Sequence, residues 1–182
     1  MTGWTWPNGY QVSEFVRPFN EDGRTFIHHA ADAVLAAAAA GEYAVIRPRT
    51  FREREGRPKP ETKRVPVPAT VAHFVMNLPA SAIDFLPCFK GLYAGRETLF
   101  APHTATPLPL VHVHCFAVKR DDDVPKLDVC ARVSRQLGVD MAPGDPERDN
   151  EVAVSFVREV APKKSMYCAT FRLPPQVAFA AR

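Results

Sequence analysis

The sequence predicts an α/β fold that matches the second half of a doubly wound sheet and ends in an antiparallel hairpin. Apolar runs typical of strands alternate with segments of helical spacing along most of the 182 residues. Near the C-terminus, two strand-like runs are separated only by Ala161-Pro162-Lys163, which is typical of a hairpin. The first two strands of a complete doubly wound domain have no counterpart, so we expect half a sheet.

The N-terminal part of the chain predicts a strand, a turn and a helix. Residues 11–20 are expected to form the first strand, from Val12 through Phe19, and Asn20 to Arg24 a turn. Residues 24–41 predict a helix that ends near Gly41, because apolar residues recur at helical spacing and the alanine run favours helix: Phe26, Ile27, Ala30, Ala31, Val34 and Leu35.

The middle of the chain predicts a loop, a strand and a second helix. Residues 47–68 are rich in Pro, Arg and Lys and predict a long surface loop. Residues 70–78 are nearly all apolar and predict a buried central strand of a parallel sheet. Residues 80–94 predict a helix that Pro87 kinks or interrupts, with one buried stripe of Ala82, Ile83, Leu86, Phe89 and Lys90.

The C-terminal part predicts a third strand, a third helix and the hairpin. Residues 108–119 place Val111, Val113, Cys115 and Ala117 on one face of a strand, and His112, His114 and Phe116 on the other. Residues 122–137 predict a helix with Asp123 as N-cap and Gly138 as stop. Residues 151–160 and 164–173 predict the hairpin strands, with an antiparallel strand at the sheet edge.

Length and composition predict one domain over residues 11–178, preceded by an atypical segment over 1–10. No run of about 18 apolar residues suggests a membrane span, and the first residues resemble neither a secretory signal nor a transit peptide. The four cysteines are far apart without a C-x-x-C, which indicates a reducing compartment, with no disulfide framework and no zinc site: Cys88, Cys115, Cys130 and Cys168.

The positive charge is concentrated in one segment. Residues 47–64 hold eight basic and three acidic residues, a local charge of +5 in a chain of +3. A solvated surface loop is the usual explanation for such a segment. The more specific hypothesis is that Arg52 and Arg54 contact RNA phosphates. The same two interpretations apply to Lys163 and Lys164 in the hairpin turn.

The segment from Met76 to Leu86 is the most informative one for function. An apolar strand stops at Asn77, and Pro79 prevents further strand pairing. An Asn at the carboxyl end of a strand in an α/β sheet lies where ligands bind, and its amide can hydrogen-bond a base edge. This predicts a substrate site of an enzyme acting on a nucleotide or nucleobase, against the simpler role of a turn cap.

Other chemistry-bearing residues carry weaker signals. His112 and His114 share a strand face, as metal ligands can, but no third ligand is evident, so structural histidines are favoured over a metal site. Asp22-Gly23 is typical of a turn built around an Asp side chain. No G-x-G occurs among the nine glycines, so the turn that usually holds a dinucleotide or S-adenosylmethionine is not found.

Four segments together carry a resemblance to a known family. They are 19–24 (Phe-Asn-Glu-Asp-Gly-Arg), 76–86, 111–116 (Val-His-Val-His-Cys-Phe), and 157–168 with 171–174. The chain resembles the C-terminal part of the catalytic domain of eukaryotic and archaeal tRNA (guanine-37-N1)-methyltransferases, from about residue 15 to about residue 177. The resemblance implies a class I S-adenosylmethionine-dependent, Rossmann-like fold.

The resemblance also implies residue roles. Asp22, with Gly23, matches the acidic residue that accepts from the adenine amino group of S-adenosylmethionine. Asn77 and Pro79 match the motif at the target base and the methyl donor: Asn77 holds the guanine and the Pro79 turn shapes the pocket wall. The implied partner is tRNA and the implied protein is a monomer that needs no metal or membrane, in the cytoplasm and also in the mitochondrial matrix and nucleus.

Two departures from the family pattern keep other hypotheses open. The Gly-rich turn, the Arg and Glu that the family places upstream, and the N-terminal tRNA-binding domain have no match here. The chain is therefore either a methyltransferase that is inactive alone, or a non-catalytic truncated or RNA-contacting fragment. A weaker alternative is the related aminocarboxypropyl transferase of the wybutosine pathway, which uses the same cofactor.

Overall fold

A computed structural model describes residues 16–46, 61–119 and 122–181. The chain divides into two compact units, one built from residues 1–21 and 32–69 and the other from residues 22–31 and 70–182. Helix α1 (Gly23–Ala39) contributes its first part to the second unit and its remainder to the first. It starts and ends close to the predicted positions, and Gly41 follows it with φ of 68°.

The first unit contains a two-stranded antiparallel sheet of β1 (Tyr43–Ile46) and β2 (Lys63–Pro66). The prediction of a continuous loop over 47–68 is therefore wrong at residues 63–66. The strand predicted over 11–20 is also wrong in its described part, because residues 16–20 have no regular structure. The strand β2 begins with Lys63 and Arg64, which continue the basic run before them, and a basic, Pro-rich composition favours a loop.

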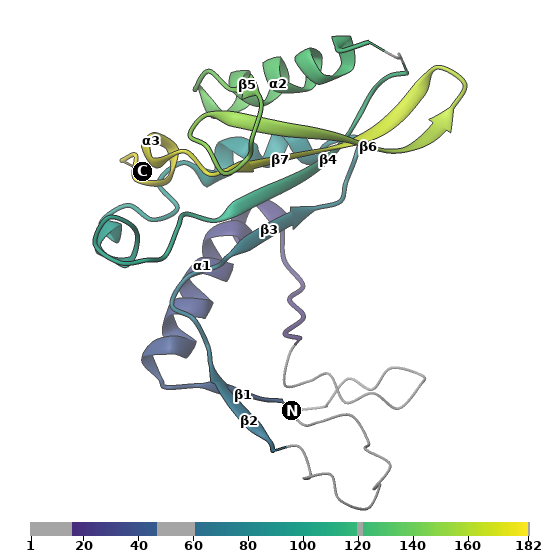
Figure 1. Cartoon of the computed structure of the whole chain (residues 1–182). Coiled ribbons are helices and arrows are strands. Elements are labelled where there is room, and N and C mark those ends of the chain that lie inside the picture. Colours follow the sequence, from purple (N-terminus) through teal and green to yellow (C-terminus); the bar gives the residue numbers. More distant parts are fainter. Residues whose placement is uncertain (1–15, 47–60, 120–121, 182) are drawn as a thin grey trace, which may run out of the picture. The chain divides into compact units, whose positions relative to one another are not determined.

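The second unit is built on a five-stranded mixed sheet in the order β3-β4-β7-β6-β5 (Figure 1). Its strands are β3 (His73–Met76), β4 (Leu110–Val118), β5 (Ala142–Pro143), β6 (Glu151–Ala161) and β7 (Lys164–Arg172). The β3–β4 and β5–β6 pairs are parallel, and the β4–β7 and β6–β7 pairs are antiparallel. The third strand and the hairpin are thus confirmed, and the architecture is α/β.

Two predictions about strand position are wrong. β3 lies at the edge of this sheet and leaves Val75 67% exposed, so it is not a buried central strand. The antiparallel strand β7 lies inside the sheet, between β4 and β6, and not at its edge. An apolar run shows that a strand can be buried, but pairing with distant strands decides whether it is.

The helix predicted over 80–94 is present in part, as the shorter 3₁₀-helix η1 (Ala82–Phe89). Pro87 lies inside it and has no N–H to donate to the carbonyl of Ile83, which an α-helix would require. Bonds of the shorter i→i+3 type follow, such as Lys90 N to the Pro87 carbonyl at 3.2 Å. The buried side of the segment is nevertheless the predicted one, apart from Lys90, which is exposed.

Helix α2 (Val124–Leu137) has the predicted limits, and Gly138 ends it with φ of 69°. Asp123 precedes the helix as predicted, but its side chain does not cap it and instead binds Lys126 Nζ at 2.8 Å. The carboxylate of Asp122 accepts from the Val124 N–H at 3.2 Å. Two further short helices are η2 (Glu97–Leu99) and α3 (Pro175–Ala178).

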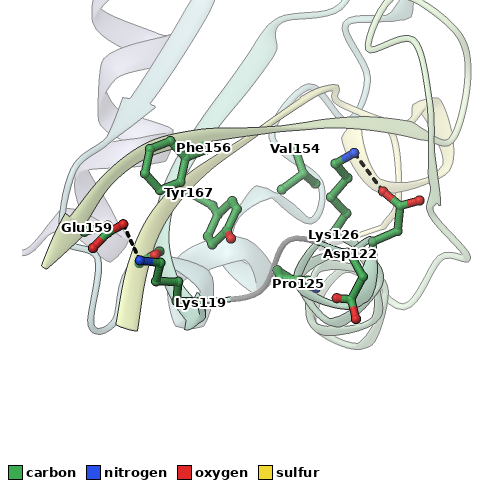
Figure 2. Close-up of a pocket in the computed structure, with 10 residues that line it drawn as sticks. Lys119, Asp122, Pro125, Lys126, Val154, Phe156, Glu159 and Tyr167 are labelled. Carbon is green, nitrogen blue, oxygen red and sulfur yellow. Dashed lines mark hydrogen bonds and ion pairs between the residues drawn. The ribbon is translucent and has the colours of Figure 1, made fainter. Parts of the chain in front are cut away.

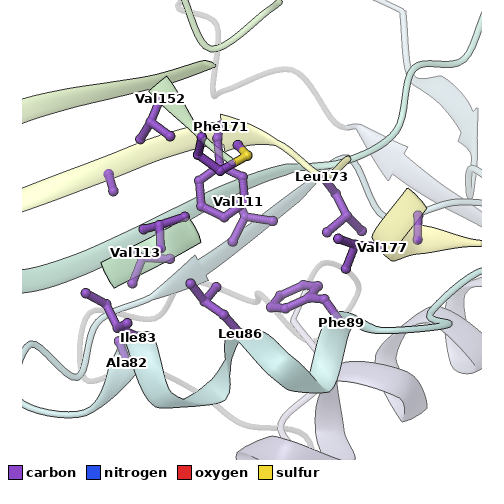
Figure 3. Close-up of a cluster of buried hydrophobic side chains, with 14 of the residues drawn as sticks. Ala82, Ile83, Leu86, Phe89, Val111, Val113, Val152, Phe171, Leu173 and Val177 are labelled. Atoms are coloured by element: carbon purple, nitrogen blue, oxygen red, sulfur yellow. The ribbon is translucent and has the colours of Figure 1, made fainter. Parts of the chain in front are cut away.

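The core of the second unit lies between η1, α2 and one face of the sheet. In Figure 3, Val111 and Val113 of β4 and Phe171 of β7 point toward Leu86 and Phe89 of η1. All five side chains are completely buried. This packing holds the end of β4 and the start of η1 in fixed positions, and the candidate site lies there.

Candidate functional site

The carboxyl ends of β3 and β4 lie at the same edge of the sheet, because the two strands are parallel and Met76 pairs with Val113. Asn77 directly follows Met76 at this edge. Its side chain is exposed and makes no hydrogen bond with the described residues. The predicted role as a side-chain turn cap is therefore not fulfilled, and the amide is available to a ligand.

Backbone hydrogen bonds fix the turn that carries Asn77. The Leu78 carbonyl accepts from Ser81 N at 2.9 Å and from Ala82 N at 2.7 Å. The Pro79 carbonyl accepts from Phe116 N of β4 at 3.2 Å. Asn77 is thus presented by a turn that is anchored to the sheet at one end and to η1 at the other.

Arg132 of α2 completes this junction. β3 ends before it reaches Phe116, so no strand pairs with Phe116 on that side of β4, and Arg132 Nη2 donates to the Phe116 carbonyl at 2.8 Å. The same Nη2 lies 3.0 Å from the Asp128 carboxylate. The buried Nε of Arg132 has no partner among the described residues. The sequence alone did not point to Arg132, because the signal is a contact between residues 16 positions apart.

A cavity of about 180 Å³ lies beside the turn. Pro79 forms part of its wall. The other residues lining it are Ala80, Ile83, Asp84, Arg132, Arg135 and Gln136. The cavity therefore offers both hydrogen-bond donors and an acceptor beside an apolar wall, which suits a polar, planar group.

Asp22 caps helix α1. Its Oδ1 accepts from Arg24 N at 2.8 Å, and its Oδ2 pairs with Arg24 Nη1 at 3.3 Å. Gly23 packs closely on η1, because a Cβ there would lie 3.3 Å from the Phe85 ring. The Arg24 guanidinium also lies over that ring, 4.6 Å from its centroid. The structure thus brings the 19–24 motif into contact with the 76–86 motif.

The hairpin turn lies at the end of β4. The Lys163 carbonyl accepts from Lys119 N at 3.2 Å, and Lys164 Nζ lies 4.0 Å above the Phe116 ring. Phe116 therefore contacts the Pro79 turn through its backbone and Lys164 through its side chain. Both lysines are exposed, as RNA-contacting residues must be. Arg52 and Arg54 lie outside the described residues.

The histidines form a row on the sheet face opposite the core. His73 Nδ1 lies 3.0 Å from His112 Nε2, and His112 Nδ1 lies 3.0 Å from Thr170 Oγ1. Burial, and then the proximity of His73 and His114, lowers the pKa of His112. Within the described ranges, no group of three or more His, Cys, Asp or Glu side chains could hold a metal ion. The sequence missed His73, which joins the row only through the β3–β4 pairing.

The four cysteines are free thiols. Burial raises the pKa of Cys115 to about 11 and also raises the pKa values of Cys130 and Cys168. A thiol must ionise to act as a nucleophile, so these three cysteines do not suit covalent catalysis. In the described part of the chain, no helix is long and apolar enough to cross a membrane.

A second cavity lies between the first turn of α2 and the β6–β7 hairpin (Figure 2). It has a volume of about 350 Å³. Its lining combines charged groups with aromatic rings from four separate segments, which is why no sequence motif indicated it. The lining residues are Lys119, Asp122, Asp123, Pro125, Lys126, Val154, Phe156, Glu159, Ser165 and Tyr167.

Comparison with known proteins gives close relatives. The chain is 55% identical over 175 residues, 96% of its length, to the tRNA (guanine(37)-N(1))-methyltransferase of Neurospora crassa. It is 56% identical over 172 residues to the protein of the same name from Fusarium vanettenii, which covers 94% of the chain. It is 40% identical over 172 residues to that of Schizosaccharomyces pombe, which covers 93% of the chain.

The matched region is only part of each relative. The chain spans 37% of the Neurospora crassa and Fusarium vanettenii proteins and 36% of the Schizosaccharomyces pombe protein. No family model matches the chain. No solved structure matches it either. The motif-based recognition is confirmed. The chain is homologous to a segment that makes up 37% of the length of each of the Neurospora crassa and Fusarium vanettenii tRNA (guanine(37)-N(1))-methyltransferases.

Proposed function

We propose that this chain contributes the base-binding part of a methyltransferase that transfers a methyl group from S-adenosylmethionine to N1 of the guanine 3′ of the tRNA anticodon. The observation that carries the proposal is the placement of Asn77. Its uncommitted amide stands at the carboxyl end of β3, next to the polar cavity at Pro79. In this proposal the mixed sheet is part of a class I, Rossmann-like methyltransferase domain.

The Asn77 amide suits the guanine edge. Its NH₂ group can donate to guanine O6, and its oxygen can accept from a base N–H. Donation to O6 stabilises the negative charge that guanine acquires as N1 loses its proton. The polar side chains around the Pro79 cavity supply further donors and acceptors for the same base, with Arg135 and Gln136 as candidates at the α2 side.

The cofactor, when bound, supplies an electrophilic methyl group on a sulfonium. The N1 lone pair forms the new N–C bond, the C–S bond breaks, and S-adenosylhomocysteine leaves. The N1 proton must pass to an acceptor, and neither Asn77 nor Pro79 can take it. A positioned general base accelerates such a reaction by about 10²–10⁴-fold. The activity of the chain by itself therefore depends on whether one of its own residues accepts the N1 proton.

Asp22 fits the proposed contact with the adenine amino group. A carboxylate offers about four lone-pair sites. Two are used by Arg24, one by its backbone N–H and one by its guanidinium. Asp22 is exposed, so its remaining lone pairs are accessible to an amino group while it continues to cap α1.

Binding of anticodon stem–loop RNA tests the proposal. We expect the chain to bind an RNA with guanine at position 37 about tenfold more tightly than the same RNA with adenine there, as measured by fluorescence anisotropy. Asn77→Ala should remove this preference. The control Gln176→Ala removes another exposed amide from α3, which follows β7 at the opposite end of the sheet, and should preserve it.

Two measurements separate the alternatives. Calorimetry with S-adenosylmethionine should show no binding tighter than about millimolar, equivalent to about −4 kcal/mol, because no Gly-rich turn was found in the sequence. Mass spectrometry of tRNA incubated with the chain and cofactor distinguishes a methyl from an aminocarboxypropyl product. Equal binding of guanine and adenine RNAs by the unchanged chain would contradict the proposed role of Asn77.

A further inference from the structure

The cavity between α2 and the hairpin is lined by charged side chains together with two aromatic rings. The β6–β7 hairpin extends past the first turn of α2, so the sheet face at its end is not covered by a helix (Figures 1 and 2). Register irregularities at Phe156/Arg158 and Glu159/Ala161 interrupt the regular pairing of the hairpin and increase its local twist. The result is a cavity with a charged rim and an aromatic wall.

The aromatic wall consists of Phe156 and Tyr167. Their rings meet edge to face, with centroids 5.9 Å apart and an interplanar angle of 79°. Tyr167 is buried, whereas Phe156 is 59% exposed. A large aromatic side chain that is fixed by its neighbour and exposed at a cavity provides a stacking surface for a planar ligand.

Ser165 provides an independent indication of a ligand. The residue is completely buried and lines the cavity, and its Oγ has no hydrogen-bond partner among the described residues. A buried hydroxyl without a partner is destabilising, so such groups in native proteins call for a bound water or ligand. Ser165 lies on the inner strand β7, paired with Ala117 of β4 on one side and with Glu159 of β6 on the other, so it lines the floor of the cavity.

The charged groups select the kind of planar ligand. Glu159 pairs with Lys119 at 2.5 Å (Figure 2). Asp123 pairs with Lys126 at 2.8 Å, so two carboxylates are held in place at the rim. Each retains lone pairs that can accept from a ring N–H or an exocyclic amino group. The two lysines, with Lys163 and Lys164 in the adjoining turn, can neutralise backbone phosphates.

We propose that this cavity binds an unpaired nucleotide, with its base stacked on Phe156 and its amino-bearing edge on the carboxylates. The inference rests on the proposed function in one respect, namely that the nucleotide belongs to the same RNA whose guanine reaches Asn77. Both sites adjoin the end of β4, since Lys119 follows that strand and Phe116 contacts the Pro79 turn. A flanking nucleotide held there would position the target base.

Titration with nucleoside 5′-monophosphates tests the cavity without RNA or activity. Adenosine, guanosine and cytidine monophosphates should shift the amide resonances of Phe156 and Ser165, and uridine monophosphate, which has no amino group, should bind most weakly. The absence of shifts at both residues up to 10 mM, or strongest binding by uridine monophosphate, would overturn the proposal. Ser165→Ala should weaken nucleotide binding without lowering Tm, because it removes a hydroxyl that stabilises nothing in the free protein.

Anticodon stem–loops with single abasic positions test the link to the target guanine. One abasic position other than 37 should weaken binding about tenfold in the unchanged chain and have no effect in Phe156→Leu. The control Val157→Ala, at an exposed residue that does not line the cavity, should behave like the unchanged chain. Equal losses in Phe156→Leu and the unchanged chain at every position would overturn the flanking-nucleotide assignment.

The two proposals fail in different ways. If the unchanged chain showed no preference for guanine at position 37, only the proposed role of Asn77 would be contradicted. Loss of monophosphate shifts and of the Phe156-dependent abasic effect concerns this cavity alone.

Discussion

The two faces of β4 differ in what they contribute to the protein. On one face Val111, Val113 and Cys115 are at most 1% exposed and pack in the core with η1 and α2. On the other face His112, His114 and Phe116 are half-buried, and they contact polar or charged partners such as Thr170 and Lys164. One strand therefore contributes buried apolar side chains to the core and half-buried side chains to a row of polar contacts.

Neighbouring residues of one strand thus serve different purposes, because one side chain is buried in the core and the next makes polar contacts. The alternation of β4 assigns each side chain to one face. Substitutions of buried side chains on the covered face should destabilise the protein strongly, while substitution of the exposed Asn77 after β3 should change binding and leave the fold intact.

The largest effect is expected from Phe171→Ala, on the covered face of β7. Phe171 is completely buried, and its truncation should lower the free energy of unfolding by about 3–5 kcal/mol, because it removes apolar contacts and leaves a cavity. Denaturation with urea measures the change. Phe156→Ala, at a residue of the neighbouring strand that is 59% exposed, should cost less than about 1 kcal/mol, and a similar loss for both would show that burial does not set the cost.

A smaller effect is expected from Arg132→Leu, which acts where the two faces meet. The change leaves the Phe116 carbonyl without its donor, and we expect a loss of about 1–3 kcal/mol in the free energy of unfolding. Arg135→Leu is the matched control, because this exposed arginine lies on the same helix and should change stability by less than about 0.5 kcal/mol. If Arg132→Leu were equally neutral, the junction would not depend on that bond.

The open face should respond to pH. The pKa of His112 is lowered in the folded protein, so as pH falls below about 6.5 the unfolded state takes up a proton first. The stability that neutral His112 contributes is therefore complete above pH 6.5 and is lost as pH falls toward the folded pKa. Urea titrations at pH 7.5 and pH 5.5 should show this loss, and His112→Gln should reduce it. His103→Gln, at an exposed histidine, should leave it unchanged.

The smallest effect on stability is expected from Asn77→Ala. The exposed amide makes no hydrogen bond with the described residues, so the free energy of unfolding should change by less than about 0.5 kcal/mol while the preference for guanine at position 37 disappears. A loss of more than about 1 kcal/mol would show that Asn77 is a structural turn residue.

The sequence by itself determined the features that depend on neighbours along the chain. Alternation at 111–117 specified the two faces of β4, helical spacing and Gly138 specified α2, and Pro79 specified where β3 must stop. The segments at 19–24, 76–86, 111–116 and 157–174 together indicated the family, because each is a short pattern of residue types that can be read along the chain.

Only the tertiary structure decided the features that depend on pairing between distant segments. It placed the apolar strand β3 at the sheet edge, joined His73 to His112, and brought Arg132 to Phe116. It also assembled the cavity of Phe156, Ser165 and Tyr167 against the start of α2. Periodicity shows which side of a strand is apolar, but it carries no information about which segment lies beside it, since that choice depends on the packing of the whole sheet.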